Sequence, residues 1–176
     1  MLRLEPHPSQ TRLPDLDLQV RLSRSAGILS LSFHLRDPQA EVLLPDIAEH
    51  PERRDGLWRT TCFELFLAQP GHSSYHELNL SPAGHWNLLH FRETRQTADS
   101  GWTPQELAFQ FIRRANGGEL TAELPLEPLG LADGPLRLGV CAVLDTAGSG
   151  PTHWALVHPM PHPDFHDPRG FVLNIT

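Results

Sequence analysis

The chain has 176 residues, a formal net charge of -7, and 14 basic residues, all arginine. A chain of this length can bury its own core, and we expect one domain over residues 1–176. Basic residues form no run longer than two, so nucleic acid is not expected as a partner. The sequence has no secretory signal and no apolar stretch near the roughly 20 residues of a membrane span. We therefore expect a cytoplasmic protein that binds no membrane, and its oligomeric state stays open.

The first half of the chain alternates apolar and polar residues in short segments. This pattern predicts strands over 16–22 and 28–35, joined by a turn at Ser25-Ala26-Gly27. Residues 37–56 are rich in Pro, Asp and Arg and are predicted to form a loop with one short strand or turn at 42–44. Further strands are predicted over 60–68, 75–80 and 86–92. A Ser-Pro-Ala-Gly turn joins the last two.

The second half continues in the same way. Segments 107–113 and 119–124 flank Asn116-Gly117-Gly118, which predicts a hairpin. Residues 136–144 are continuously apolar, as in a central strand buried on both faces. Segments 153–157 and 171–175 are the last predicted strands. About ten strands without a convincing helix predict an all-β fold, an antiparallel β-sandwich of jelly-roll type.

One face of the predicted strands between 60 and 80 is unusually polar. Glu64 is out of phase with its apolar neighbours, and Tyr75, Glu77 and Asn79 share one parity on the next strand. Hydrogen-bonding groups in a row on a sheet face indicate a ligand surface. The opposite parity supplies the predicted core, together with the 136–144 strand: Phe63, Leu65, Leu67, Leu78, Leu80, Leu138 and Val140.

Three motifs in this region carry a family resemblance. They are Trp58, Cys62-Phe63-Glu64, and the run from Glu77 through Asn79-Leu80-Ser81-Pro82 to Trp86, and the closing segments with Trp154 and 171–173 fit the same pattern. With these motifs the chain resembles the DOMON-like proteins grouped with family 9 carbohydrate-binding modules. The resemblance spans roughly residues 15–175 and is strongest between 57 and 95.

The resemblance implies a β-sandwich that binds a ligand on its concave face. The ligand is a sugar in the carbohydrate-binding branch and haem in the cytochrome branch, and catalysis is not implied. Phe91 and Arg95 fit the end of the family pattern. Thr94, however, stands where a tyrosine is expected, so one aromatic contact is missing.

A saccharide site needs aromatic rings for the C–H faces of the sugar and polar groups for its hydroxyls. The candidate ligand-binding residues that meet this need are Trp58, Arg59, Glu64, Tyr75, Glu77, Asn79, Arg95 and Trp154. A purely structural alternative is that the two tryptophans cap the core and the glutamates pair with arginines across strands.

Two carboxylates on neighbouring strands are also the groups that a glycosidase needs. The chain has no nucleophile elbow, phosphate loop or dinucleotide motif, so binding is favoured over catalysis and no catalytic residue is assigned. We interpret the protein as a non-catalytic binder of a small polar ligand, a saccharide before others. The alternatives are a haem or metal redox module and a protein-interaction domain.

The His-rich segment 153–166 holds four histidines, His153, His158, His162 and His166, among several prolines. Such a tract can bind metal, but a plain surface loop is the favoured interpretation, and no metal is assigned. Haem ligation of the cytochrome type needs a Met and a His, and Met160, between His158 and His162, offers such a set of ligands. No cofactor is expected, and haem stays an alternative. Cys62 and Cys141 are expected to be free, with a disulfide only if their strands are neighbours.

Overall fold

The computed structural model describes residues 1–98, 102 and 104–176, and within them all regular structure is β-strand except for three short 3₁₀ turns. The strands are β1 (Leu2–Pro6), β2 (Asp17–Ser25), β3 (Ile28–Arg36), β4 (Cys62–Ala68), β5 (Tyr75–Leu80), β6 (Trp86–Glu93), β7 (Gln96–Ala98), β8 (Ala108–Arg114), β9 (Gly117–Pro125), β10 (Leu136–Thr146), β11 (Gly150–Ala155) and β12 (Leu173–Ile175). The 3₁₀ turns are η1 (Leu57–Arg59), η2 (Glu127–Leu129) and η3 (Pro168–Gly170).

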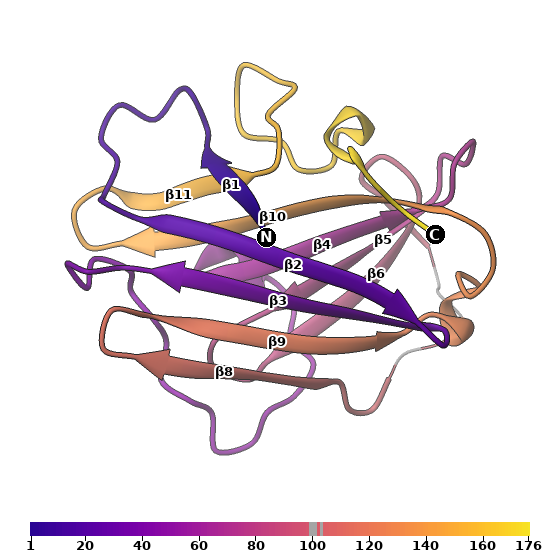
Figure 1. The fold of residues 1–176 in the computed structure, drawn as a ribbon, viewed down its shortest axis with the longest axis horizontal. Coiled ribbons are helices and arrows are strands. Elements are labelled where there is room, and N and C mark those ends of the chain that lie inside the picture. The colour runs from indigo at the N-terminus through magenta and orange to yellow at the C-terminus, as the bar shows by residue number, and fades with distance from the viewer. Residues whose placement is uncertain (99–101, 103) are drawn as a thin grey trace.

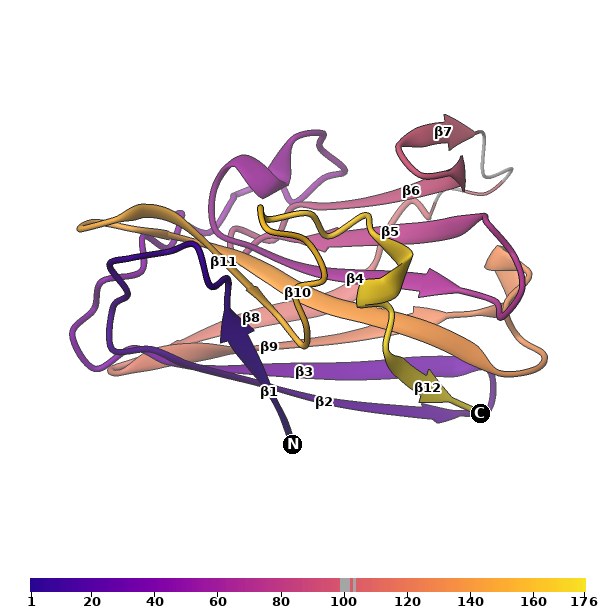
Figure 2. The ribbon, with the colours of Figure 1, turned by 90° about the horizontal axis from the view of Figure 1, so that it is seen from above.

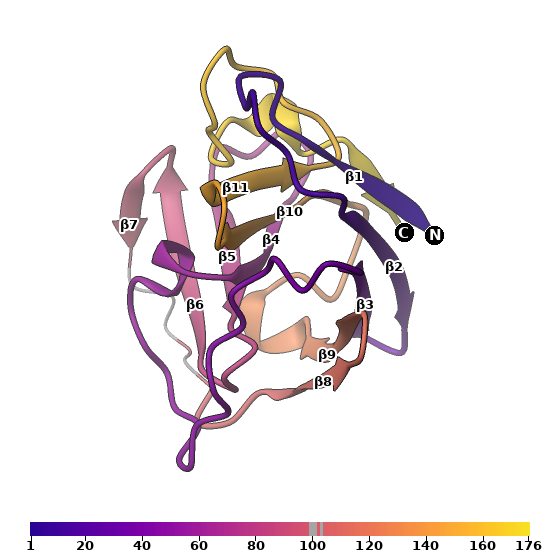
Figure 3. The same ribbon diagram turned by 90° about the vertical axis from the view of Figure 1, so that its left-hand side faces the viewer.

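The strands form two packed layers (Figure 1). The larger layer has the order β7-β6-β5-β4-β10-β11, with β12 paired to β10, and the smaller has the order β2-β3-β9-β8. Strand β1 joins the layers at one side, because it pairs with β2 through Leu2–Leu4 and with β11 through Glu5 and Pro6 (Figure 3). Every pairing between named strands is antiparallel, which confirms the predicted all-β sandwich.

The core lies between the two layers and is built by strand alternation. On β4 the core side carries Phe63, Leu65 and Leu67, none of which is more than 1% exposed. These side chains meet the inward side chains of β2, β3 and β9 from the other layer. All seven residues predicted for the core belong to this cluster.

Two hairpins show how local sequence fixes the strands. Ala26 and Gly27 both have positive φ, 50° and 75°, as a two-residue turn between right-twisted strands requires. The second hairpin turns at Ala115-Asn116, one residue earlier than predicted, because Gly117 already pairs with Arg114. Gly118 serves packing instead, since a Cβ there would lie 2.3 Å from the ring of Phe111.

The twelve strands in the described part of the chain exceed the predicted number of about ten because β1 and β7 were not expected. β1 has the composition Leu-Arg-Leu-Glu-Pro, which carries a weak strand signal, and it is held by pairing on both sides. β7 has only three residues and pairs with β6 alone. Among the described residues, no helix has the length and hydropathy needed to cross a membrane.

Candidate ligand-binding site

A cavity of about 400 Å³ lies on the outer face of the larger layer. Two segments outside the strands contribute to its lining: the turn η1, and the segment between β11 and β12, which Figure 2 shows in yellow. Its lining residues come from five strands, the turn between β6 and β7, η1 and the segment between β11 and β12: Trp58, Glu64, Glu77, Leu89, Phe91, Arg95, Val143, His153, Pro163, Asp164, Phe165 and His166.

Strand register brings the two glutamates to this face. Glu64 on β4 is opposite Asn79 on β5, and Glu77 lies two residues before Asn79 on the same strand. Residues two apart on a strand share a face, so Glu64, Glu77 and Asn79 all point outward while Phe63 and Leu78 point into the core. The parity argument therefore placed the two glutamates correctly on one surface.

Both glutamates are buried without a full set of partners. Each is 3% exposed, and among the described residues the only buried side-chain polar atoms without a hydrogen bond are Glu64 Oε1 and Glu77 Oε2. The other oxygen of Glu77 accepts a 2.6 Å hydrogen bond from Asn79 Nδ2. The other oxygen of Glu64 has only the Cys141 thiol, at 4.0 Å. Such orphaned groups cost free energy, and both side chains belong to the lining of the cavity.

Burial changes the acidity of this pair. Loss of hydration raises the pKa of Glu64 well above its usual value, and the nearby Glu77 carboxylate raises it further. Burial also raises the pKa of Glu77, while the hydrogen bond from Asn79 and the charge of Arg95 oppose the rise. Two neighbouring acids whose charged forms are both disfavoured are typical of a functional site.

His166 closes one side of the cavity. Its Nδ1 lies 2.7 Å from the Tyr75 hydroxyl, and its Nε2 lies 3.5 Å from Glu77 Oε2 without forming a hydrogen bond to it. The ring packs edge-on against Phe66 and Phe91. Burial, with a smaller contribution from Arg95, lowers the pKa of His166 to about 4, so the ring is neutral at pH 7.

Arg95 and Asp164 form the outer wall. Arg95 lies at the turn between β6 and β7 with a φ of 59°, and its Nη2 is 2.8 Å from Asp164 Oδ1. Asp164 also accepts the backbone N–H of His166, at 3.0 Å. The same carboxylate thus holds both the arginine and the histidine loop in place.

Trp58 forms the exposed rim. Its side chain is 49% exposed and lies under the guanidinium of Arg59, 5.3 Å from the ring centre. The loop that precedes it is tied to β6, since Arg53 Nε donates to Asn87 Oδ1 at 2.7 Å and Asn87 Nδ2 donates to Asp55 Oδ1 at 2.8 Å. These two bonds fix the approach of the chain to η1.

The remaining predicted site residues divide into three positions. Tyr75 and Asn79 lie under the cavity and hold His166 and Glu77, while Arg59 is exposed beside Trp58 and is not part of the lining. The prediction that Trp154 belongs to the ligand-binding site is wrong. Trp154 is 2% exposed inside the sandwich core, and its Nε1 donates to Thr152 Oγ1, so it cannot stack on a ligand at this face.

The histidine-rich segment contributes more than a plain surface loop would. His153, Asp164, Phe165 and His166 line the cavity, whereas His162 is exposed and His158 binds the Glu5 carbonyl. Strand periodicity could not assign these loop residues to the site, and their only signal was the clustering of His and Asp.

The residues considered for a metal site, a haem site and a disulfide lie as follows. Within residues 1–98, 102 and 104–176, no three His, Cys, Asp or Glu side chains gather as metal ligands. The carbonyl of Met160 contacts His7 Nε2 at 3.1 Å. Strands β4 and β10 are neighbours, but Cys62 and Cys141 are free and buried. Burial first, and then the charge of Glu64, raise the pKa of both thiols well above the usual value, so neither is a ready nucleophile.

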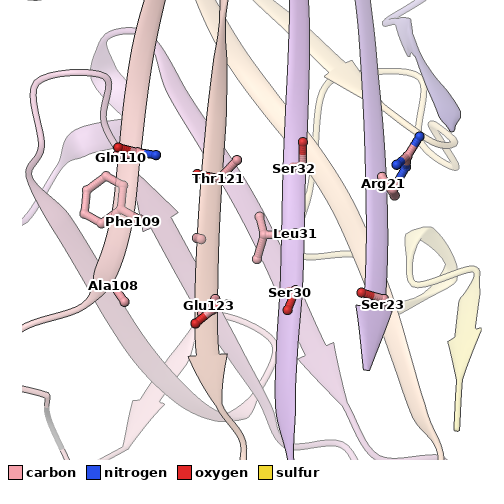
Figure 4. Close-up of a pocket in the computed structure, with 11 residues that line it drawn as sticks. Arg21, Ser23, Ser30, Leu31, Ser32, Ala108, Phe109, Gln110, Thr121 and Glu123 are labelled. Carbon is pink, nitrogen blue, oxygen red and sulfur yellow. The ribbon is translucent and has the colours of Figure 1, made fainter. Parts of the chain in front are cut away.

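A second hollow of about 460 Å³ lies on the outer face of the smaller layer (Figure 4). Its floor is a grid of short side chains across four strands, with Ser23 beside Ser30 and Ser32 beside Thr121. Arg21 and Gln110 stand at its two ends. None of its lining atoms is among the buried atoms without a hydrogen bond. The cavity over Glu64 and Glu77 is therefore the stronger candidate.

Comparisons with known proteins identify the fold. No protein-family model matches the sequence, and no curated protein matches it. A candidate carbohydrate-binding protein from Bacteroides uniformis has the same fold, with a TM-score of 0.65 and 14% identity over 99% of this chain and 85% of its own. A family 9 carbohydrate-binding module from Caldicellulosiruptor kristjanssonii, solved with glucose, has a TM-score of 0.63 and 8% identity over 99% and 83%. At these identities the likeness establishes the sandwich fold.

Proposed function

We propose that this protein is a non-catalytic saccharide-binding domain whose site is the cavity over Glu64 and Glu77. The observation that carries the proposal is the pair of buried carboxylate oxygens that have no hydrogen-bond donor. A sugar presents several hydroxyl donors in a fixed geometry, and two of them would satisfy both oxygens.

The rest of the cavity suits the same ligand. Trp58 on the rim and Phe91 and Phe165 in the wall offer apolar rings to the C–H faces of a sugar. Arg95 and Asp164, which are already paired, add a donor and an acceptor at the entrance. A volume of about 400 Å³ is within the usual size range of small-ligand pockets.

The structural neighbours support this proposal at the level of fold. One is described as a candidate carbohydrate-binding protein, and the other is a carbohydrate-binding module in complex with glucose. Binding rather than catalysis is also the role that their descriptions name. Fold alone does not determine function, and the ligand is inferred from the side chains of the cavity. The DOMON-like assignment and the cytoplasmic location stay predictions.

The test is titration calorimetry of the purified protein with glucose and a panel of other monosaccharides and disaccharides. We expect dissociation constants on the order of micromolar to millimolar, because an open site buries only part of a small ligand. Glu77→Ala and Trp58→Ala should each weaken binding at least about tenfold while the protein stays folded. Arg21→Ala, in the second hollow, is the matched control and should leave the affinity unchanged. Binding that survives the first two changes and is lost in the control would move the site to the smaller layer.

A further inference from the structure

The charges that line the cavity are unbalanced. Its lining contains three carboxylates, Glu64, Glu77 and Asp164, and one guanidinium, that of Arg95. Arg95 is already engaged, since its Nη2 lies 2.8 Å from Asp164 Oδ1. The arginine and the aspartate offset each other at the entrance, so Arg95 opposes only part of the rise that burial causes in the pKa of Glu77.

His166 cannot supply the missing positive charge. The backbone N–H of Arg95 donates to the Tyr75 hydroxyl at 3.2 Å, which leaves the tyrosine proton free to be donated to His166 Nδ1. In that arrangement Nε2 carries the single ring proton and faces Glu77 Oε2 at 3.5 Å. The imidazole is then neutral and forms no hydrogen bond to that oxygen, in keeping with its burial among aromatic rings.

The other titratable groups around the pair are also uncharged or acidic. Cys62 on β4 and Cys141 on β10 are buried thiols, and His153 on β11 is half-buried. Burial, and then the neighbouring His7 and His158, lower the pKa of His153, which disfavours its cationic form. Among the described residues that line the cavity, no side chain on a bordering element is therefore a cation that is not already paired.

We propose that the cavity prefers an amino sugar in its ammonium form to the neutral sugar with the same ring. This inference rests on the proposed function and names its ligand class. A neutral sugar gives hydroxyl donors to Glu64 Oε1 and Glu77 Oε2 but brings no charge that would favour the ionised form of either acid. An ammonium group donates to the same oxygens and also balances the charge, and such charge-assisted hydrogen bonds are about twice as strong as neutral ones.

The experiment compares three ligands by titration calorimetry at pH 6.5: glucosamine, glucose and N-acetylglucosamine. The last carries nitrogen at the same ring position without its charge. We expect glucosamine to bind at least about tenfold more tightly than either neutral sugar. The preference should weaken as salt is added, although less than for an exposed ion pair.

Two variants separate charge from shape. Glu64→Gln keeps the size of the side chain and removes its charge, and it should bring glucosamine and glucose to within about threefold of each other. Glu123→Gln, an exposed strand residue in the other layer, should keep the full preference. Circular dichroism and melting of each variant establish that it is folded.

The outcomes distinguish this inference from the proposed function. If glucose binds and glucosamine binds no more tightly, the inference is overturned and the saccharide-binding proposal stands. If the preference is present but unchanged in Glu64→Gln, the ammonium lies elsewhere and the inference is equally overturned. If none of the three sugars binds at millimolar concentration, both fail.

Discussion

Replacing Glu64 by glutamine should make the protein more stable at neutral pH. Glu64 is 3% exposed, and its Oε1 has no donor, so the folded protein keeps an unsatisfied acidic group in its interior. Leaving such a group unpaired costs about 1–3 kcal/mol. A glutamine of the same shape removes the charge, and its amide N–H can donate toward the unpartnered oxygen of Glu77. We expect Glu64→Gln to raise the free energy of unfolding by about 1–3 kcal/mol at pH 8, or roughly 2–12 °C in Tm for a chain of this length.

The size of this gain should depend on pH in a defined direction. The pKa of Glu64 in the folded protein is raised well above the usual 4.5, so the folded state binds more protons than the unfolded state above pH 4.5. Stability from this group is therefore complete below 4.5 and is lost as pH rises through the folded pKa. Glutamine does not titrate, so the advantage of Glu64→Gln should be smallest near pH 4 and largest near pH 8.

The assay is urea unfolding of wild type and variant at pH 4.5, 6 and 8, followed by tryptophan fluorescence. Glu123→Gln is the control, because Glu123 is exposed on a strand of the other layer and its change should have no pH-dependent effect. A Glu64→Gln protein that is less stable than wild type at pH 8, or equally displaced at every pH, would refute the argument that this carboxylate is buried at a cost.

Three further predictions test the fold and the frame of the site. Phe63 is 0% exposed, and its ring centre lies 5.0 Å from that of Phe33. Phe63→Ala should therefore lower the free energy of unfolding, measured by chemical unfolding, by about 3–5 kcal/mol. A loss below about 1 kcal/mol would contradict its central place in the core. Asn87→Ala removes two hydrogen bonds that hold the loop before Trp58. It should weaken saccharide binding several fold in calorimetry while changing the free energy of unfolding by only about 1–3 kcal/mol. Unchanged affinity would mean that this loop does not position Trp58 at the rim. Burial and the adjacent His90 lower the pKa of His76 from 6.5 to about 4. The contribution of His76 to stability is therefore present above pH 6.5 and is lost as pH falls toward 4. His76→Leu should reduce this loss of stability in acid, and a dependence of stability on pH identical to that of wild type would contradict the prediction.

The alternation of apolar and polar residues predicted most of the strands and the two glutamates at the centre of the site. It separated Phe63 from Glu64 and Leu78 from Glu77, which distinguishes the core face from the polar face. It also failed in a definite way at β1 and β7, since one is short and polar and the other has only three residues. Pairing with neighbours, not local sequence, makes these two segments strands.

The remainder of the site depends on contacts between distant parts of the chain. His166 reaches Glu77 and Tyr75 across about ninety residues of sequence, and no local pattern encodes that approach. Trp154 shows the opposite failure. A tryptophan near a predicted polar face looks like a stacking residue, but its position opposite Ala142 on β10 turns it into the core. One residue of register decides between these two roles.

The most direct test of the central claim is an NMR titration of the isotope-labelled protein with glucose and glucosamine. We predict that both sugars shift the signals of Glu64 and Glu77 and their neighbours on β4 and β5, the Trp58 indole N–H, and the His166 ring, with larger shifts at lower concentration for glucosamine. Shifts confined to Ser30, Ser32 and Thr121 on the outer face of the smaller layer, or no shifts at millimolar sugar, would contradict the claim that the cavity over Glu64 and Glu77 binds saccharide.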